Sequence, residues 1–430
     1  MAESDRVTAA HSNSTRGMLR VLSIAPTSFF GDYGCHVRIL EEARALKSLG
    51  HDVTILTYYK GNNIPGFRVI RTAPTPWHRD YEVGSSRHKY AFDTLLAIRL
   101  ARVLARNKFD VIHAHLHEGA LIASLVSAPW HIPVCFDYQG SLTSEMLDHG
   151  FLHHGTKALG FWKRLERFIE GLPAVIFTST HNASDTLKAN HSSAKLIQTL
   201  PDGVNTEIFH PDVLTPNERA TRRAAFGFLA DDPVIVFLGL LARHQGIHCL
   251  IDAAVLLKQQ GRRVRWLIMG YPGVIYWQNE AIRNGLEKEL VFTDRVPYSN
   301  AAQMLALGDI AVAPKLSLTE GSGKILNYMA MGLPTVAFDT PAQVEYLGSL
   351  GVYAPVGNVE QLAQRIAELI DSPEKRITLG QRSRIRARQL FGWDRIGQQL
   401  DTVYRQLCSN QADYPAVMNT DSNTPQRYKP

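Results

Sequence analysis

The chain has 430 residues, of which 45% are hydrophobic and 20% charged, an ordinary globular composition that excludes a largely disordered or fibrous protein. Its formal charge of +6 at pH 7 is too small and too dispersed for nucleic-acid binding, although it would suit an anionic substrate or membrane surface. Four widely spaced cysteines without a CxxC pair argue against a disulfide scaffold or a structural zinc site and favour a reducing compartment.

Short apolar runs alternate with longer amphipathic stretches along most of the chain. The first series predicts strands at 19–25, 53–58, 68–71, 110–115, 134–138 and 174–179, with helices at 37–49, 91–107 and 157–169. The second predicts strands at 234–238, 265–269, 310–313 and 335–338, with helices at 247–260, 302–307 and 323–331. Such alternation is typical of doubly wound α/β sheets.

The two series predict two α/β domains. We expect a disordered leader at 1–17, a first domain at 18–200, an interdomain linker at 201–231, a second domain at 232–390, a final helix at 391–408 and a disordered tail at 409–430. The N-terminus lacks an apolar signal segment and the longest apolar runs are too short to span a bilayer, so a cytoplasmic location is expected. Ligands of such sheets bind beyond the carboxyl ends of the strands, in the cleft between them.

The first predicted strand is followed by a glycine-containing loop, 31–36, that opens a helix. Gly31 and Gly34 would let backbone amides approach a phosphate or a sugar, although a plain tight turn explains them about as well. The loop is not GxGxxG, and Tyr58 and Tyr59 rather than an acidic residue end the next strand, which disfavours a nicotinamide dehydrogenase.

Polar side chains also follow two later strands. His113, His115 and His117 alternate along and just past one strand, so all three are predicted to point to one face. Three imidazoles can bind zinc, but a polar cleft wall is the favoured interpretation, and the chain has no HExxH or Asp-x-Asp, so we expect no metal. Gln139 lies in a polar loop that could bind sugar hydroxyls. A purely structural role for this loop explains the sequence nearly as well.

The most informative segment is 313–334. A strand ends, a loop presents Glu320, and Gly321-Ser322-Gly323 opens a helix that carries Lys324. Amides at this helix start, the helix dipole and the lysine together predict an anion site, beside which Glu320 would grip sugar hydroxyls. On its own, the segment is explained more simply as an acidic helix cap.

Four segments in the same order resemble the retaining GT-B glycosyltransferases of family four. They are the glycine loop at 31–36, the interdomain segment Pro201–Pro211, the glycine loop at 238–246 and the donor motif at 319–334. The resemblance covers nearly all of residues 18–407. It implies two Rossmann-like domains facing across a cleft, with a C-terminal helix that crosses back to the first domain.

The resemblance also implies an activity. A sugar would pass from a nucleotide diphosphate sugar on the second domain to a hydroxyl of a glycan or lipid-linked acceptor on the first, with retention and without a metal or other cofactor. No nucleic-acid partner is expected. The aromatic and basic helix at 157–169 could dock on the inner membrane face, although a core-packed helix with a solvated basic edge is the simpler interpretation.

The matching motifs, together with the polar residues that follow the strands, give the expected site. Its catalytic residues would be Glu320, Lys324 and His115, with His117 and Gln139 on the acceptor side. The donor would contact Gly31, Gly34, Gly239, Arg243, Gln245, Gly321, Ser322, Gly323 and Asn327.

The sequence departs from the family at the expected donor site. Leu240 and Gln245 stand where the family usually has arginine and lysine for the diphosphate, and Asn327 aligns with a glutamate that holds ribose. These departures motivate the main alternative, a non-catalytic GT-B-like sugar-binding or partner subunit. A nucleotide-sugar epimerase is a third hypothesis.

Overall fold

The computed structural model describes residues 17–32, 34–75, 89–148, 151–190, 196–318 and 321–412. The predicted leader, except for Gly17, and most of the predicted tail lie outside the described residues. Helix α15 spans Trp393–Ala412, so it continues past residue 408 into the segment predicted to be the tail.

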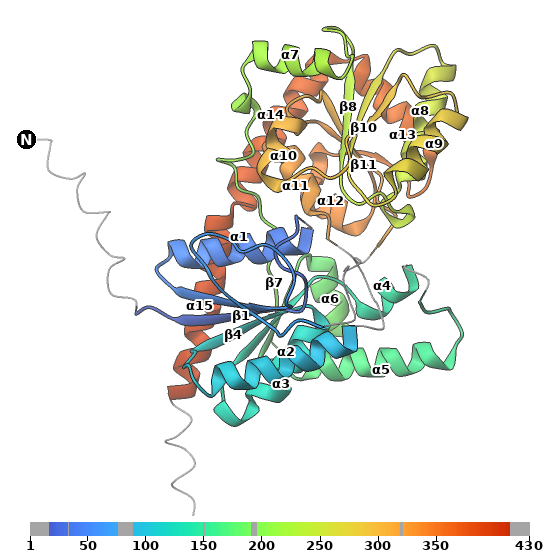
Figure 1. The fold of residues 1–430 in the computed structure, drawn as a ribbon. Coiled ribbons are helices and arrows are strands. Elements are labelled where there is room, and N and C mark those ends of the chain that lie inside the picture. The colour runs from blue at the N-terminus through green and yellow to red at the C-terminus, as the bar shows by residue number, and fades with distance from the viewer. Residues whose placement is uncertain are drawn as a thin grey trace, which may run out of the picture.

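The first domain, in the lower half of Figure 1, is built on a parallel sheet of seven strands. Their order is β3-β2-β1-β4-β5-β6-β7. The strands are β1 (Arg20–Ala25), β2 (Asp52–Thr57), β3 (Arg68–Arg71), β4 (Val111–His115), β5 (Val134–Tyr138), β6 (Val175–Thr178) and β7 (Leu196–Thr199). The helices are α1 (Gly34–Ser48), α2 (Lys89–Leu104), α3 (Leu116–Ser127), α4 (Leu142–Asp148), α5 (Lys157–Gly171) and α6 (His181–Asn190). The six predicted strands are confirmed to within about one residue at either end, and β7 was not predicted.

The second domain has a parallel sheet of six strands in the order β10-β9-β8-β11-β12-β13. The strands are β8 (Val234–Leu238), β9 (Arg265–Met269), β10 (Leu290–Phe292), β11 (Ile310–Ala313), β12 (Thr335–Phe338) and β13 (Val352–Ala354). Its helices are α8 (Ile247–Gln259), α9 (Val274–Arg283), α10 (Tyr298–Leu305), α11 (Gly323–Ala330), α12 (Pro341–Leu347), α13 (Val359–Ile370) and α14 (Pro373–Leu390). The four predicted strands of this series are confirmed.

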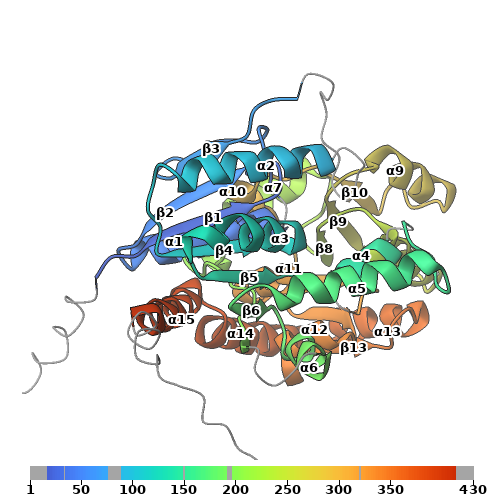
Figure 2. The same ribbon diagram turned by 90° about the horizontal axis from the view of Figure 1, so that it is seen from below.

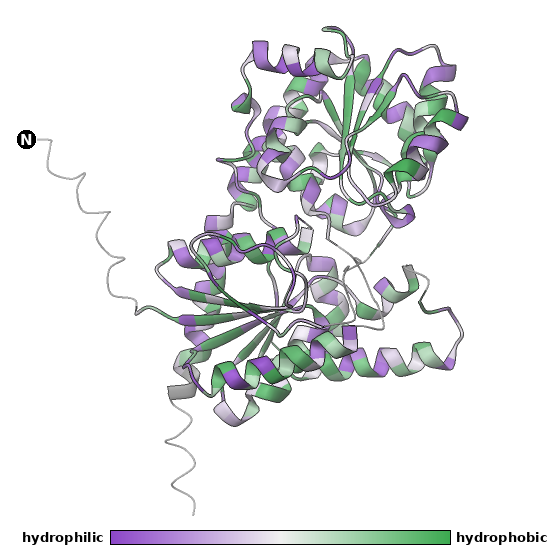
Figure 3. Ribbon diagram, viewed as in Figure 1, coloured by the Kyte–Doolittle hydropathy of each residue, from purple (hydrophilic) through white to green (hydrophobic). Residues whose placement is uncertain are grey.

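Each sheet is covered by helices on both faces, as parallel sheets require. In the first domain, α1 and α15 pack on one face and α2, α3 and α5 on the other. In the second, α8, α9 and α13 cover one face and α10, α11, α12 and α14 the other. Figure 3 shows hydrophobic residues concentrated in the strands and hydrophilic ones on the outer sides of the helices.

The segment predicted to be a linker contains a helix, α7 (Pro216–Ala225). Thr215 and Glu218 form a reciprocal capping box around Pro216, which marks the start of the helix. The helix was not predicted because the segment is polar. Arg219 and Arg223 attach the helix to the second domain through Asp309, with N–O distances of 2.7 and 2.5 Å. This part of the predicted linker is therefore packed as part of the second domain.

Helix α15 crosses back to the first domain, as expected (Figure 1). Its residues Ile396, Leu400 and Tyr404 join the core between α1 and the first sheet. Asp401 on this helix lies 2.9 Å from the Nε2 atom of His51, beside β2. The C-terminal helix thus ties the second domain to the first.

Candidate active site

A cleft with a cavity volume of about 460 Å³ separates the two domains. Residues that follow β1, β4, β5 and β6 line it from the first domain, and residues that follow β8, β9 and β11 line it from the second. Seen from below, the labelled strands of the first sheet follow one another in the order β3, β2, β1, β4, β5 and β6 (Figure 2). The carboxyl ends of both sheets therefore meet at one site, as the doubly wound topology predicts.

The wall formed by the second domain carries an anion-binding arrangement at the start of α11. Ser322, Gly323 and Lys324 line the cleft here. Ser322 makes no side-chain cap, and its Oγ atom is buried without a hydrogen-bond partner among the described residues. A helix start with an unused hydroxyl donor and a lysine favours a bound anion.

Two neighbours hold the Lys324 ammonium in place, and a third leaves room for it. It donates a hydrogen bond to the Oε1 atom of Gln245 at 3.0 Å and lies 4.5 Å from the centre of the Phe237 ring. A Cβ atom on Gly239, whose φ is +153°, would come within 2.5 Å of the Lys324 Nζ atom. Gly239 therefore makes room for the lysine, and Gln245 orients it.

Lys315 and Asp202 support the loop in front of α11. The buried Lys315 donates to the Gly321 carbonyl oxygen at 2.6 Å. A Cβ atom on Gly321 would lie 2.8 Å from the Oδ2 atom of Asp202, which comes from the interdomain segment. Glycine at 321 thus lets this loop close against residues at the edge of the first domain.

The other predicted donor residues divide into two groups. Asn327, one turn beyond Gly323 on α11, lines the cleft, as does Gly34, which has open space where a side chain would be. Arg243 is exposed and Gly31 half-buried, and neither lines the cleft. Arg243 begins a 3-10 turn whose later residues, among them Gln245, line the cleft. The donor contacts of Arg243 and Gly31 stay predictions. Glu320 lies outside the described residues, so its role stays a prediction.

The prediction that His113, His115 and His117 share one face is wrong. Leu116 has a φ of +60°, so the chain turns there into α3. His113 and His115 stack on the face of the sheet that carries α1 and α15, whereas His117 packs against Phe136 and Tyr138. His117 lines the cleft and His115 does not.

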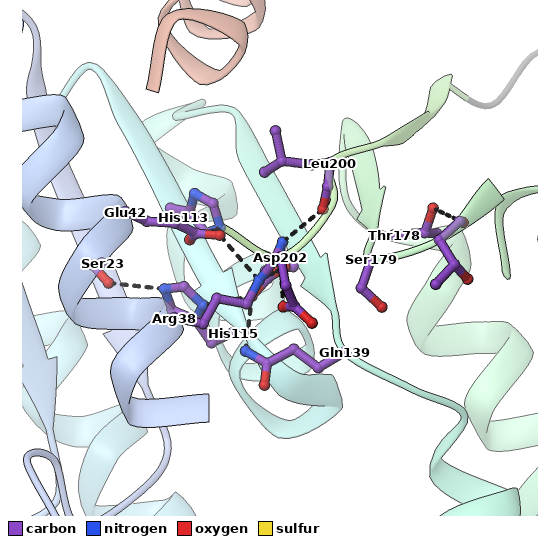
Figure 4. A network of polar contacts seen from close by, with 12 residues as sticks. Ser23, Arg38, Glu42, His113, His115, Gln139, Thr178, Ser179, Leu200 and Asp202 are labelled. Atoms are coloured by element: carbon purple, nitrogen blue, oxygen red, sulfur yellow. Dashed lines mark hydrogen bonds and ion pairs between the residues drawn. The ribbon is translucent and has the colours of Figure 1, made fainter. Parts of the chain in front are cut away.

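His115 belongs to a buried network (Figure 4). Its Nε2 atom lies 3.1 Å from Ser23 Oγ, and its Nδ1 atom lies 2.9 Å from Asp137 Oδ2. The distances match a Ser-His-Asp triad, but none of the three residues lines the cleft, so no substrate carbonyl can reach the serine. His115 therefore does not face the cleft, and a direct catalytic role for it is not supported by the geometry.

Arg38 on α1 is the centre of this network (Figure 4). Its guanidinium donates to both Asp137 oxygens at 2.8–3.0 Å and to Asp202 Oδ1 at 2.9 Å. The other Asp202 oxygen lies 3.0 Å from the hydroxyl of Tyr346, on α12 of the second domain. One buried arginine thus connects the first sheet, the interdomain segment and the second domain.

The charges of the network follow from burial and pairing. Burial opposes ionisation of Asp137, but Arg38 and His115 outweigh it and hold the pKa of Asp137 below its usual value. Burial raises the pKa of Glu42 well above its usual value. Glu42 lies 3.0 Å from Arg38, but Asp137 and Asp202 also pair with this arginine. The pKa of His113 is lowered by burial, so this imidazole is neutral.

Two buried groups bring imidazole and carboxylate atoms close enough for a metal ion. In the group Glu42, His113, His115 and Asp137, the carboxylates already face the Arg38 guanidinium, whose charge would repel a cation. In the group His117, Glu166 and Glu170, Glu166 already accepts hydrogen bonds from the Ser141 and Thr143 hydroxyls. In each group, contacts within the protein therefore already engage at least one carboxylate.

The wall formed by the first domain is polar and carries both charges. Gln139 lines it and donates to Asp137 at 2.8 Å, while Lys89 and Glu118 form an ion pair. At the rim, Asp32 pairs with Arg295 of the second domain at 3.1 Å and accepts from the Tyr298 amide at 3.0 Å. The predicted acceptor residues His117 and Gln139 therefore lie on one wall, opposite the predicted donor site.

Comparison with known proteins identifies the family. The model of Glycosyltransferase Family 4 matches residues 34–208, and that of Glycosyl transferases group 1 matches residues 232–372. Among curated relatives, the chain is 26% identical to MMP alpha-(1->4)-mannosyltransferase of Mycolicibacterium hassiacum, covering 92% of this chain and 99% of the relative. It is 24% identical to 2-deoxystreptamine glucosyltransferase of Streptomyces kanamyceticus, covering 78% and 89%.

The solved structures agree on the fold. Sucrose-phosphate synthase from Thermosynechococcus elongatus superposes with a TM-score of 0.77 at 18% identity, covering 91% of this chain and all of that one. The fold is GT-B, as predicted, and the comparisons give no support to a non-catalytic subunit. The chain belongs to glycosyltransferase family 4, the group 1 glycosyl transferases.

Proposed function

We propose that this chain transfers a sugar from a nucleoside diphosphate sugar to a hydroxyl of a glycan or lipid-linked acceptor, with retention and without a metal. The observation that carries the proposal is the start of α11, which lines the cleft opposite Gln139 and His117. Lys324 lies there beside the Ser322 hydroxyl, for which the described residues offer no hydrogen-bond partner. Retention is proposed because the resemblance to the retaining enzymes of family four implies it.

In the proposed reaction the bond between the anomeric carbon and the diphosphate breaks and a bond to the acceptor oxygen forms. The acceptor proton passes to an oxygen of the departing diphosphate. Negative charge grows on that diphosphate in the transition state, and Lys324 with the amides of Gly323 and its neighbours would stabilise it. Asn327 would hydrogen-bond the ribose, and Glu320 would hold sugar hydroxyls of the donor. Closure about the interdomain segment at Asp202 would exclude water, which competes with the acceptor.

A release assay tests this proposal. The purified chain is incubated with UDP-, GDP- and ADP-sugars, with and without a lipid and glycan extract, and free nucleoside diphosphate is followed. We expect release from one donor that increases with the extract. Tight nucleotide binding in calorimetry without release from any donor would instead support a non-catalytic subunit.

We further propose that the acceptor is presented at a membrane and that α5 docks there. Lys163, Arg164 and Arg167 are exposed on this helix, between Phe161 and Phe168, which are 61% and 54% exposed. The N-terminal half of α5 extends beyond the first sheet (Figure 1), and the opposite side of the helix packs on the core through Ile169. No helix in the described ranges is long and apolar enough to cross a bilayer, so contact would be at the surface.

Reversing the charge of Lys163, Arg164 and Arg167 to glutamate should weaken binding to vesicles with anionic headgroups. The loss should be about 3 kcal/mol, or roughly 100-fold, because each basic residue near such a surface contributes about 1 kcal/mol. Co-sedimentation measures it. Lys375, Arg382 and Arg388 on α14, also exposed, give the matched triple control. Equal loss in both variants would discard α5 as the docking surface.

A further inference from the structure

One carboxyl group of α5 lies behind the first-domain wall of the cleft. Glu166 is only 6% exposed, whereas Lys163, Arg164 and Arg167 on the same helix are exposed. Within the described ranges, its ion-pair partner is the imidazole of His117, with 3.7 Å between Glu166 Oε1 and His117 Nε2. Burying a carboxylate costs free energy, so other polar contacts must offset that cost.

Those contacts come from the loop that follows β5 and from the start of α4. The Ser141 hydroxyl donates to Glu166 Oε1 at 2.8 Å. The Thr143 hydroxyl donates to Glu166 Oε2 at 2.6 Å, and the Thr143 amide lies 3.4 Å from the same oxygen. Ser141 Oγ also accepts from the Ser144 amide at 3.2 Å, at the first turn of α4. Both oxygens of one carboxylate thus fix the chain where the loop becomes a helix.

The loop held in this way forms part of the cleft wall, whereas the groups that hold it from behind do not. Residues 139–142 line the cleft. Glu166 and Thr143 do not line it. An effect of either residue on a molecule bound in the cleft would therefore be transmitted through the position of the loop.

Glu166 also faces His117, which lines the cleft and is 5% exposed. The Phe136 and Tyr138 rings pack edge-on to the imidazole, at 5.1 and 5.2 Å between ring centres. Burial lowers the pKa of His117, and the Glu166 and Glu118 carboxylates only partly offset this effect, so the imidazole is neutral at pH 7. The 3.7 Å separation from Glu166 is too long for a hydrogen bond. The carboxylate and the two aromatic rings therefore confine the imidazole without using its hydrogen-bonding capacity.

We infer that Glu166 is a positioning residue for the acceptor. From behind the wall it holds residues 139–142 and the His117 imidazole where the acceptor binds, without touching the acceptor itself. The inference rests on the proposed function, which places the acceptor at Gln139 and His117. A displacement of about 1 Å in a binding wall can slow a reaction roughly 100-fold, so loss of this support should be visible in acceptor use.

Conservative variants at two positions test the inference. Thr143→Val removes the hydroxyl that bonds to Glu166, while Thr143→Ser keeps it. Glu166→Gln preserves the shape of the side chain but exchanges one acceptor oxygen for an amide donor. The matched controls are Thr186→Val and Glu360→Gln, at exposed positions on α6 and α13 that do not line the cleft.

The release assay is run over a range of extract concentrations and, separately, of donor concentrations. For Thr143→Val and Glu166→Gln, the extract concentration that gives half-maximal release should rise about tenfold, whereas the KM for the donor sugar should change less than about twofold. The reason is that the donor wall belongs to the second domain. Thr143→Ser should restore most of the loss, and both controls should match the unaltered chain. Equal changes in the two constants, or a Thr143→Val variant that behaves like the unaltered chain, would overturn the inference.

Hydrogen exchange separates this inference from the proposed function. It is measured by mass spectrometry on the full chain without substrates, for peptides that cover residues 139–148. Thr143→Val and Glu166→Gln should accelerate exchange there about tenfold or more, and Thr143→Ser and the two controls should not. If the unaltered chain turns over no donor, the proposed function fails, and the exchange alone decides whether Glu166 positions this wall. Unchanged exchange would overturn the inference in either case.

Discussion

Replacing Lys324 with alanine is expected to lower kcat/KM for nucleoside diphosphate release by about 10²–10³-fold, the usual cost of removing one group that stabilises transition-state charge. The ammonium lies at the start of α11, held by Gln245 at 3.0 Å and by the Phe237 ring at 4.5 Å. Because these contacts hold the lysine in place before the diphosphate develops its charge, the loss should appear mainly in kcat rather than in KM.

The control for this variant is Lys258→Ala. Lys258 on α8 is an exposed lysine that pairs with Glu289 at 3.1 Å and does not line the cleft. Its removal should leave release unchanged. A Lys324→Ala variant that retains at least a third of the activity, with nucleotide binding intact, would remove Lys324 from the mechanism and shift the role to the helix start alone.

Sequence patterns predicted the central strands because parallel strands buried on both faces are continuous apolar runs. Val111–His115 and Val234–Leu238 are of this kind. The edge strand β7 escaped prediction because only Ile197 of its four residues is buried. Helix α7 escaped because its residues are mostly charged and polar, and only the Thr215–Glu218 capping box signals its start.

The donor side of the cleft was predicted better than the acceptor side. Ser322, Gly323 and Lys324 are adjacent in the chain, so a short motif places them together. The residues that build the other wall come from separate elements: Arg38 from α1, Glu118 from α3 and Glu145 from α4. No local sequence pattern groups such residues. The alternation of the histidines predicted the wrong face for His117, because the positive φ of Leu116 changes the direction of the chain.

The buried arginine was missed for the same reason. Asp202 belongs to the recognised interdomain segment Pro201–Pro211, but its partners are 164 residues before it and 144 residues after it in sequence. This buried cation lies between two aspartates, at 2.8 and 2.9 Å, which makes its removal informative.

Replacing Arg38 with methionine is expected to destabilise the first domain by about 3–5 kcal/mol, because Asp137 and Asp202 would keep their charges without a buried partner. For a domain of this size the melting temperature should fall by roughly 6–20 °C. Differential scanning calorimetry measures the change. Arg44→Met on the same helix is the matched control, since Arg44 is 43% exposed and its ion pair within the described residues is with Glu41 alone, so it should cost less than Arg38→Met.

The pH dependence separates a lost charge pair from lost packing. A carboxylate whose pKa is depressed in the folded state contributes stability above its unfolded pKa of about 4 and loses it as the pH falls through the folded value. Arg38 depresses the pKa of Asp137, so the difference between Arg38→Met and the unaltered chain should be largest at neutral pH and shrink below about pH 4. A difference that does not change with pH, or one no larger than that of Arg44→Met, would mean that Arg38 acts through its packing and not through its charge.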